Sequence, residues 1–368
     1  MVRYRISGSR KRYKPVIVHI FTNFTKPRIH RSITATRIPM TQILAIDIGG
    51  SQMRAAPVFV SNIKSNIKLN FEVGDSVQVK LPQTMTPVDI LGTLDKLCTP
   101  VFARYPLHSF DRIGMTIPGL ADSRTWIYAP FSGIGNFPIA AILREKYQKP
   151  VFVENDVNAC AWAEKIFGVC QSVNDFLWIT ISNGIGGGLI LNGKIYPGTF
   201  GGSAEIGHFN IVENGALCGC GNRGCLEAEA AGPGIARRFE EMLAQNGGET
   251  QQRVDLLKWK KRIPAGYTLA AAEIAELARM GDPIAQEVYN LTGYYVGRAA
   301  AFAANLINPA CVVIGGGVSG AFDLLETEMK KTFYAQVFHD ANKDVKILKT
   351  GLGYEAGLYA AASLIYLD

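Results

Sequence analysis

The spacing of hydrophobic positions alternates along the chain between the two-residue period of a strand and the 3.6-residue period of a helix. This predicts strands alternating with helices from Met40 onward. Short apolar or alternating runs predict strands at Gln42–Ile48, Met53–Val60, Asn66–Val73, Arg112–Thr116, Val151–Val153, Phe176–Ser182, Gly187–Leu191, Lys194–Tyr196, Cys311–Ile314 and Val345–Leu348. Apolar residues at helical spacing predict helices at Ile90–Tyr105, Pro138–Tyr147, Asn158–Phe167, Leu226–Asn246, Leu269–Met280, Pro283–Leu306, Asp323–Ala335 and Glu355–Leu367. The polar and then basic segment 246–267 reads as a surface excursion. The order of elements predicts an α/β protein with two lobes of similar plan.

The basic charge of the chain is concentrated in its first 39 residues. The 368-residue sequence has a formal net charge of +7, but residues 1–39 hold ten Lys or Arg and no Asp or Glu. The remainder has 28 basic and 31 acidic residues, so the basic pI gives no argument for nucleic acid as a partner. Residues 1–39 lack helical period, and we expect them to be disordered. An extension upstream of a true start at Met40, an Arg-rich targeting peptide and a basic interaction arm all stay open.

Neither apolar runs nor cysteines suggest a membrane or secreted protein. No run of at least about 18 apolar residues occurs, so no membrane span or membrane partner is expected. Cys98, Cys160, Cys170 and Cys311 lie in apolar contexts, which favours a reducing compartment over a disulfide scaffold. We therefore expect a cytoplasmic protein.

One imidazole and three thiols gather in a short glycine-rich segment. His208, Cys218, Cys220 and Cys225 are the ligand set of a closed tetrahedral zinc site, and the interleaved glycines let the loop bend its sulfurs toward one point. A disulfide loop is the alternative, but Cys218 and Cys220 are too close in sequence to pair easily, and the total of seven cysteines is odd. Four protein ligands leave no coordination position for chemistry, so we expect the zinc to be structural.

Glycine turns follow three of the predicted strands. Asp47–Ser51 leads into a hairpin, Asn183–Gly188 lies between two further strands, and Gly315–Gly317 opens a helix. Glycines free backbone amides to face phosphate oxygens, and a carboxylate at a strand end can hold a magnesium ion or its waters. A single turn of this kind is equally well explained as a tight hairpin, but the order of the three predicts a protein that clamps ATP in a cleft. The residues expected at the nucleotide are Asp47, Gly49, Gly50, Ser51, Asn183, Gly184, Gly186, Gly315, Gly316 and Gly317.

The segment Glu154–Asn158 joins a buried strand to a helix, so its carboxylates emerge at an edge where a cleft is expected. Asp156 lies close to the helix N-terminus, which should keep it ionised and able to accept a proton. A helix cap is the alternative explanation for Asp156.

These turns, together with the cysteine loop, resemble the repressor, open reading frame, kinase (ROK) family of sugar kinases. Glu205-Ile206-Gly207-His208, followed by the run from Cys218 to Glu227, looks like the hallmark of that family, and the likeness extends from about Gln42 to Leu367. The resemblance implies two actin-like ATPase (ribonuclease H-like) lobes with a cleft between them. These lobes would be residues 40–157 joined by the C-terminal helix 354–368, and residues 158–353 with the zinc loop 208–225.

The resemblance also implies an activity and roles for the site residues. The implied reaction transfers the γ-phosphate of ATP, with Mg²⁺, to a hexose, most simply glucose, or to an N-acetylhexosamine. Asp156 would be the catalytic base, and Asn155 would bind the sugar. Glu205, Glu227 and the zinc-ligating His208 would accept hydrogen bonds from sugar hydroxyls, a task that suits acceptor-only carboxylates. The family resemblance further implies a homodimer or homotetramer.

The sequence departs from the family pattern at a few places near the expected sugar. The segment 129–136 has no Asn at the place where the family usually carries its sugar-contacting Asn, so Ser132 or Asn136 would have to replace it. Ser182-Asn183 replaces the first two residues of a common Gly-Thr-Gly turn, and Ala204 stands where Gly is common. These changes bear on the choice of sugar more than on the reaction.

Two other functions are open. A sugar-sensing transcriptional regulator of the same family would carry an added winged helix-turn-helix of roughly 80 residues, and 39 residues without helical pattern are too few for it. A sugar-binding protein without catalysis is disfavoured because Asp47, Asp156 and all three glycine turns are present.

Overall fold

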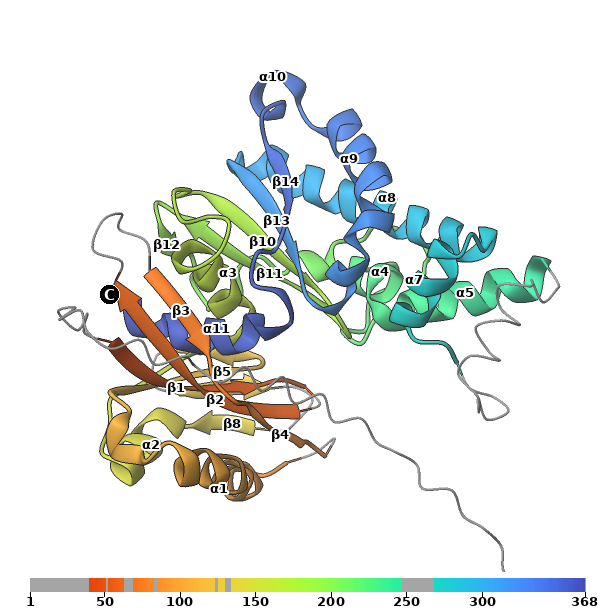
Figure 1. Ribbon diagram of the computed structural model, residues 1–368. Helices are drawn as coiled ribbons and strands as arrows, with labels where there is room; N and C mark the ends of the chain where they lie inside the picture. The colour runs from red at the N-terminus through yellow and green to blue at the C-terminus, as the bar shows by residue number, and fades with distance from the viewer. Residues whose placement is uncertain are drawn as a thin grey trace, which may run out of the picture. The chain divides into compact units, whose positions relative to one another are not determined.

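A computed structural model of the chain describes residues 40–50, 52–62, 69–82, 85–122, 125–129, 134–246 and 268–367 (Figure 1). The predicted extension 1–39 and nearly all of the predicted surface excursion lie outside the described residues. Among the helices within these ranges, none has the length and apolar character needed to cross a membrane.

The first sheet is mixed and follows the predicted strands of the N-terminal half. It has the order β3 (Leu69–Val73), β2 (Gln52–Asn62), β1 (Met40–Ile48), β5 (Arg112–Ile117), β9 (Val151–Asn155), and β4 (Val77–Lys80) pairs with β2. β1 to β3 form an antiparallel meander, whereas β5 and β9 run parallel to β1. The central part of β1 is buried from Ile43 to Ile46, as expected for a strand covered on both faces of its sheet.

The second sheet repeats this plan. Its order is β12 (Lys194–Ile195), β11 (Ile185–Leu191), β10 (Phe176–Ile181), β13 (Cys311–Gly315), β14 (Lys346–Lys349), again a meander followed by two parallel strands. The repeated order confirms the predicted α/β class and the similar plan of the two halves. A small antiparallel sheet of β6 (Leu120–Ala121), β7 (Trp126–Ala129) and β8 (Ile134–Phe137) was not predicted.

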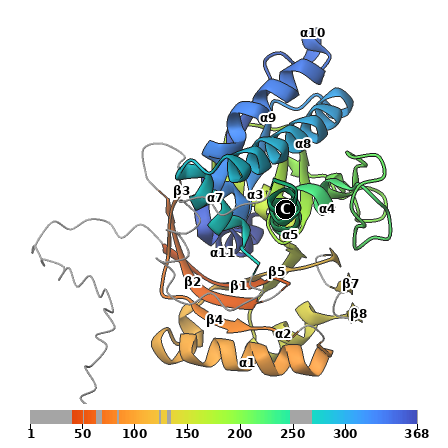
Figure 2. The ribbon, with the colours of Figure 1, turned by 90° about the vertical axis from the view of Figure 1, so that its right-hand side faces the viewer.

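Helices cover both sheets and fill the space between them (Figure 1, Figure 2). α1 (Pro87–Arg104) and α2 (Ile139–Tyr147) pack on the outer face of the first sheet. The second sheet is covered by α4 (Leu226–Ala230), α5 (Gly232–Asn246), α7 (Ala271–Arg279), α8 (Pro283–Ile307) and α9 (Phe322–Gln336). The short α10 (His339–Asn342) precedes β14.

Two further helices belong to a core that the two sheets share. α3 (Asp156–Ile166) and α11 (Ala356–Ser363) contribute to one cluster with Ile43 of β1, Val58 of β2 and Trp178 of β10. The predicted lobe boundary between residues 157 and 158 therefore falls inside α3.

Glu164 of α3 joins the two places where the chain passes from one sheet to the other. Its buried carboxylate accepts hydrogen bonds from the Val169 amide at 2.8 Å, the Gly351 amide at 3.1 Å and the Thr350 hydroxyl. Burial raises the pKa of Glu164. Val169 follows α3, and Thr350 and Gly351 precede α11, so one side chain holds both crossings.

Three predicted element boundaries are corrected by local chemistry. The single helix predicted over Leu226–Asn246 is split into α4 and α5 at Ala231, which is extended, because Pro233 suits the first turn of a new helix and not the interior of a continuous one. α3 starts at Asp156, before the predicted Asn158, because Asn155 caps it. The third glycine turn opens a 3-10 turn over Gly317–Ala321 ahead of α9.

Candidate active site

Asp47 lies near the end of β1 and is held by two polar neighbours. Its Oδ2 accepts from Nη2 of Arg54 at 2.7 Å and from Nε at 3.2 Å, and its Oδ1 accepts from the Thr116 hydroxyl at 2.8 Å. Arg54 stands directly opposite Asp47 in the β1–β2 register. An ionised carboxylate offers about four acceptor positions, so one remains for a water of a hydrated magnesium ion. Asp47 thus fits the predicted magnesium role.

Arg54 is a member of the site that the sequence reasoning missed. Its Nη1 donates to the Tyr354 carbonyl at 3.3 Å, and its guanidinium stacks 5.2 Å from the centre of the Tyr354 ring. A Cβ on Gly357 of α11 would come within 2.3 Å of Asp47 Oδ2, so the C-terminal helix approaches the same carboxylate. The signal that could have found Arg54 is its position across the predicted hairpin from Asp47.

Asp156 occupies the first position of α3 with Asn155 as its N-cap. Asp156 Oδ1 accepts from the Val157 amide at 3.0 Å and from Asn155 Nδ2 at 3.1 Å. Burial, and secondly the negative charge of Asp47, raise the pKa of Asp156 to about 7. Burial and the charge of Asp47 therefore outweigh the hydrogen bonds that favour the charged form, two effects that the prediction from the helix N-terminus did not include.

Asn155 has its polar atoms engaged within the protein. Its Oδ1 accepts from the amides of Val157 and Asn158, each at 2.9 Å, and its Nδ2 donates to the Gly119 carbonyl at 2.8 Å as well as to Asp156. A contact with a sugar would have to replace one of these bonds, so sugar binding by Asn155 stays a prediction.

The first glycine turn leaves its backbone accessible. The Gly49 amide donates to the Gln52 carbonyl at 2.9 Å, and a Cβ placed on Gly50 would meet no atom within 4 Å. Space beside the Gly50 backbone is what a phosphate needs. Ser51, the other residue predicted in this turn, lies outside the described residues.

The second and third glycine turns meet at the end of β10. Gly316 has φ of 81°, and a Cβ there would lie 2.5 Å from the Ile181 carbonyl oxygen. A Cβ on Gly315 would collide with the Trp178 ring, whereas one on Gly317 would lie 3.7 Å from the Ser182 hydroxyl. The glycines of the third turn therefore permit close approach to β10, and Asn183 beside them is exposed.

β11 connects the N-terminus of α3 to the cysteine region. Gly186 packs against Val157, the neighbour of Asp156, because a Cβ there would lie 3.0 Å from a Val157 methyl. The preceding Ile185 amide donates at 3.0 Å to Oε2 of Glu227 in α4. Gly184 lies against the same carboxylate oxygen. The second glycine turn therefore contacts the residue that follows Asp156 and also contacts the Glu227 carboxylate.

The four predicted metal ligands converge. Donor atoms of His208, Cys218, Cys220 and Cys225 all lie within 4.8 Å of one another. Cys218 Sγ is 3.7 Å from His208 Nδ1, and the Sγ atoms of Cys220 and Cys225 are also 3.7 Å apart. Two thiolates on a tetrahedral zinc would be about 3.8 Å apart, and a thiolate and an imidazole nitrogen about 3.6 Å. The separations fit zinc, and all seven cysteines are free.

The predicted sugar-binding groups border this cluster. Glu227 Oε1 lies 3.7 Å from Cys218 Sγ, and Glu205 Oε2 lies 3.9 Å from His208 Nε2. His208 therefore turns Nδ1 toward the sulfurs and Nε2 toward Glu205. Ala204, which stands where Gly is common in the family, has a left-handed φ of 59° despite its Cβ, a conformation that glycine adopts more readily.

The segment that replaces the family's sugar-contacting Asn is only partly described. Ser132 lies outside the described residues. Asn136 belongs to β8, where it is exposed and has φ of 49°. Within the described part of the chain, no contact joins Asn136 to the other site residues.

Comparison with known proteins shows the family. The model of the ROK family matches residues 43–367. The glucokinase of Streptomyces coelicolor is 30% identical over 325 residues, which are 87% of this chain and 96% of that protein. Among solved structures, a ROK family glucokinase from Streptomyces griseus in complex with glucose and AMPPNP has a TM-score of 0.72 at 28% identity. The match covers 88% of this chain and 98% of the glucokinase chain.

Regulators are equally similar in fold. A ROK family transcriptional regulator, a homolog of the Escherichia coli MLC protein, has a TM-score of 0.74 at 27% identity and covers 89% of this chain and 78% of its own.

Proposed function

Because the chain belongs to the ROK family, we propose that it is an ATP-dependent sugar kinase that transfers the γ-phosphate to a hexose, with glucose as the first acceptor to test. The observation that carries this proposal is the pair Asp156 and Asp47. Asp156 has a pKa of about 7, raised by its burial and by Asp47. A general base works best when its pKa lies near the working pH, and sugar sensing does not need one.

In the proposed reaction, Asp156 accepts the proton of the sugar hydroxyl as that oxygen attacks the γ-phosphate. Asp47 would hold a hydrated magnesium ion, which neutralises phosphate charge when bound. Arg54 and Thr116 keep the Asp47 carboxylate in place. The amides around Gly50 and Gly184 would face the phosphates in a cleft between the lobes. The glucokinase structure with AMPPNP supports nucleotide use by this fold.

Glu205, His208 and Glu227 would bind the sugar hydroxyls. Structural zinc held by His208, Cys218, Cys220 and Cys225 would supply no chemistry beyond fixing the loop. His208 Nε2 and Glu205 face each other beside the cluster, and the Ile185 amide orients Glu227, so the loop and the glycine turn set the acceptor positions together. An N-acetylhexosamine is a second acceptor class, and a homodimer or homotetramer is the expected assembly.

A sugar-sensing regulator is the alternative function, favoured by the likeness in fold to a ROK family transcriptional regulator. Turnover separates the two functions. A coupled assay with ATP and Mg²⁺ over glucose, mannose, fructose, allose, N-acetylglucosamine and N-acetylmannosamine should detect ADP release with at least one sugar. Sugar binding by calorimetry without turnover of any of them would reject the kinase and favour the regulator.

A further inference from the structure

We propose that Glu229 is a positioning residue that fastens the cysteine loop, residues 208–225, to α5 and thereby sets how tightly the cluster retains its metal. The proposal rests on the zinc site proposed above. Glu229 lies in α4, outside the group of predicted ligands and sugar-binding residues, and its side chain is only 3% exposed.

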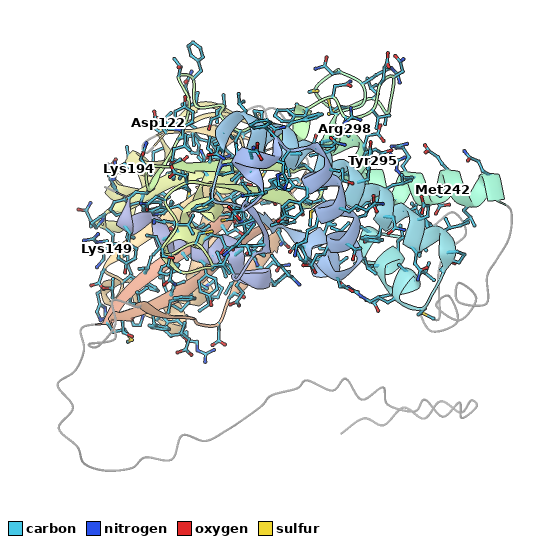
Figure 3. The ribbon with its side chains drawn as sticks, turned by 90° about the horizontal axis from the view of Figure 1, so that it is seen from above. Asp122, Lys149, Lys194, Met242, Tyr295 and Arg298 are labelled. Atoms are coloured by element: carbon cyan, nitrogen blue, oxygen red, sulfur yellow. The ribbon has the colours of Figure 1, made fainter. Side chains whose placement is uncertain are left out.

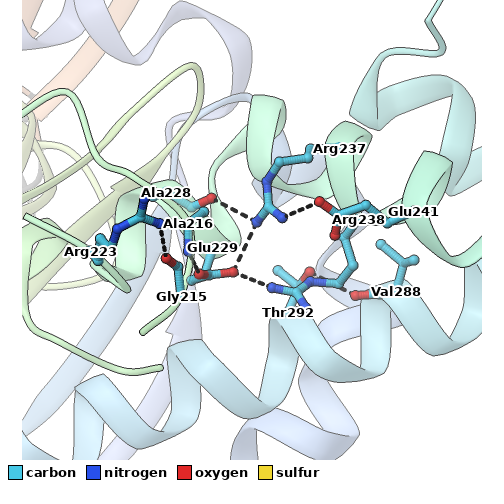
Figure 4. A network of polar contacts seen from close by, with 10 residues as sticks. All are labelled: Gly215, Ala216, Arg223, Ala228, Glu229, Arg237, Arg238, Glu241, Val288 and Thr292. Carbon is cyan, nitrogen blue, oxygen red and sulfur yellow. Dashed lines mark hydrogen bonds and ion pairs between the residues drawn. The ribbon is translucent and has the colours of Figure 1, made fainter. Parts of the chain in front are cut away.

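Figure 4 shows the Glu229 carboxylate between the loop residues Gly215 and Ala216 and the two arginines of α5. Glu229 Oε1 accepts from the Ala216 amide at 2.7 Å, two residues before Cys218. The main-chain amide of Glu229 donates to the Cys225 carbonyl at 3.1 Å, the bond that begins α4 directly after the last thiol. A Cβ on Gly215 would lie 2.3 Å from Oε1, so the loop backbone is pressed against this carboxylate. The carboxylate therefore ties the loop segment that precedes Cys218 to the helix that follows Cys225.

Two arginines of α5 hold the other carboxylate oxygen. Oε2 accepts from Nη2 of Arg237 at 3.0 Å and from Nη2 of Arg238. Arg238 is 15% exposed and stacks 4.9 Å from the centre of the Tyr295 ring, while Arg237 also donates to Glu241 at 2.7 Å. Because both guanidiniums are fixed by other contacts, the carboxylate position is fixed as well.

Further arginines close the loop around this anchor. Arg223 Nη1 donates to the Gly215 carbonyl at 3.2 Å, which joins the two limbs of the loop. Arg298 of α8 lies near Tyr295 (Figure 3) and donates to the Ile211 carbonyl at 3.3 Å. None of these contacts reaches a sulfur atom, so the arginines and Glu229 act on the metal only through the backbone of the loop.

The experiment compares Glu229→Gln with wild type as zinc-loaded full-length protein. Glutamine keeps the shape of the side chain but loses the charge that the two guanidiniums face. Zinc release is followed with a chromogenic chelator, and zinc affinity is measured by competition. We expect affinity to fall by about 10- to 100-fold, the range typical of groups that orient metal ligands.

Glu241→Gln is the matched control, because Glu241 pairs with the same Arg237 but makes no contact with the loop. It should release zinc at the wild-type rate. A Glu229→Gln protein whose release rate and affinity stay within about twofold of wild type would overturn the proposal. If Glu229→Gln does not fold, Arg237→Gln replaces it, and it should show a smaller rise in release rate. An unchanged rate in that variant would equally overturn the role of Glu229.

Excess zinc provides a readout that a purely structural role would not move. In the kinase assay, Glu229→Gln should show a raised sugar KM at limiting zinc, and saturating zinc should restore it with little change in kcat. If the wild-type protein binds no zinc, both the metal site and this proposal are rejected. If wild type and Glu229→Gln bind zinc equally tightly, only the role of Glu229 is rejected.

Discussion

Asp156→Asn should stabilise the nucleotide-free protein near and above neutral pH while it removes turnover. Asparagine keeps the Oδ1 acceptor that the Val157 amide and Asn155 Nδ2 use. It cannot ionise, so the burial of a charge and the repulsion from Asp47 both disappear. The residue proposed as the base is thus expected to lower the stability of the free protein.

The size of this gain follows from the pKa. A rise from 3.8 to about 7 in the folded state corresponds to about 4 kcal/mol once the carboxyl is ionised. Because the folded pKa lies above the unfolded value, the cost is absent below about pH 4, grows as the pH rises, and is complete above about pH 7. With an unfolding entropy of roughly 2.1 cal/mol/K per residue, 4 kcal/mol raises the Tm by about 6 °C.

Scanning fluorimetry of both proteins at pH 8 and at pH 4.5, without Mg²⁺ and nucleotide, measures this difference. The Tm gain should be largest at pH 8 and should shrink to about a quarter of that at pH 4.5, where the buried carboxyl of the folded protein is protonated. Asp340→Asn, at an exposed carboxylate of α10, should leave the Tm unchanged at both. Turnover of Asp156→Asn should fall by about 10²- to 10⁴-fold with sugar affinity retained. A variant that is less stable than wild type at pH 8 would refute the reasoning about the pKa.

Three further changes test separate parts of the site. Gly50→Ala should leave the Tm unchanged, since its Cβ meets nothing within 4 Å, but should raise the KM for ATP about tenfold or more; an unchanged KM would place the phosphates elsewhere. Asn155→Ala should lower the free energy of unfolding by about 1–2 kcal/mol in urea titration, because two amides at the start of α3 lose their acceptor, and equal stability would contradict this capping role. Cys220→Ser should lower both the zinc content measured by metal analysis and the Tm; a zinc-free variant with the wild-type Tm and sugar KM would refute a structural metal.

Local sequence patterns were sufficient for much of this fold. The runs around Ile43 and Phe176 predicted central strands because apolar residues with turn signals on either side have few alternatives. The strands of the small third sheet were missed, since β6 has two residues and β7 and β8 four each, too few to show a period. The break at Ala231 was visible in the following Gly-Pro-Gly, but the helical spacing on both sides concealed it.

In the site, too, the residues that are close in sequence were predicted, and those brought together by the fold were not. His208 and the cysteines converge because their spacing in sequence is short and glycines permit the loop to close. Arg54 and Arg238 were missed because their partners, Asp47 and Glu229, are reached only through strand pairing or helix packing. The pKa of Asp156 could not be predicted from the helix terminus, since burial and a carboxylate 109 residues earlier in the chain decide it.

The shared core around α3 and α11 limits how this polypeptide can be divided. A fragment ending at residue 157 would keep only the first two residues of α3, and one that stops before Ala356 would uncover the apolar face of β1 and β2. Each half would then present to water the surface that the other normally covers. Although each half has its own sheet and its own glycine hairpin, neither is a self-sufficient folding unit, and heat or denaturant should melt both halves in a single transition.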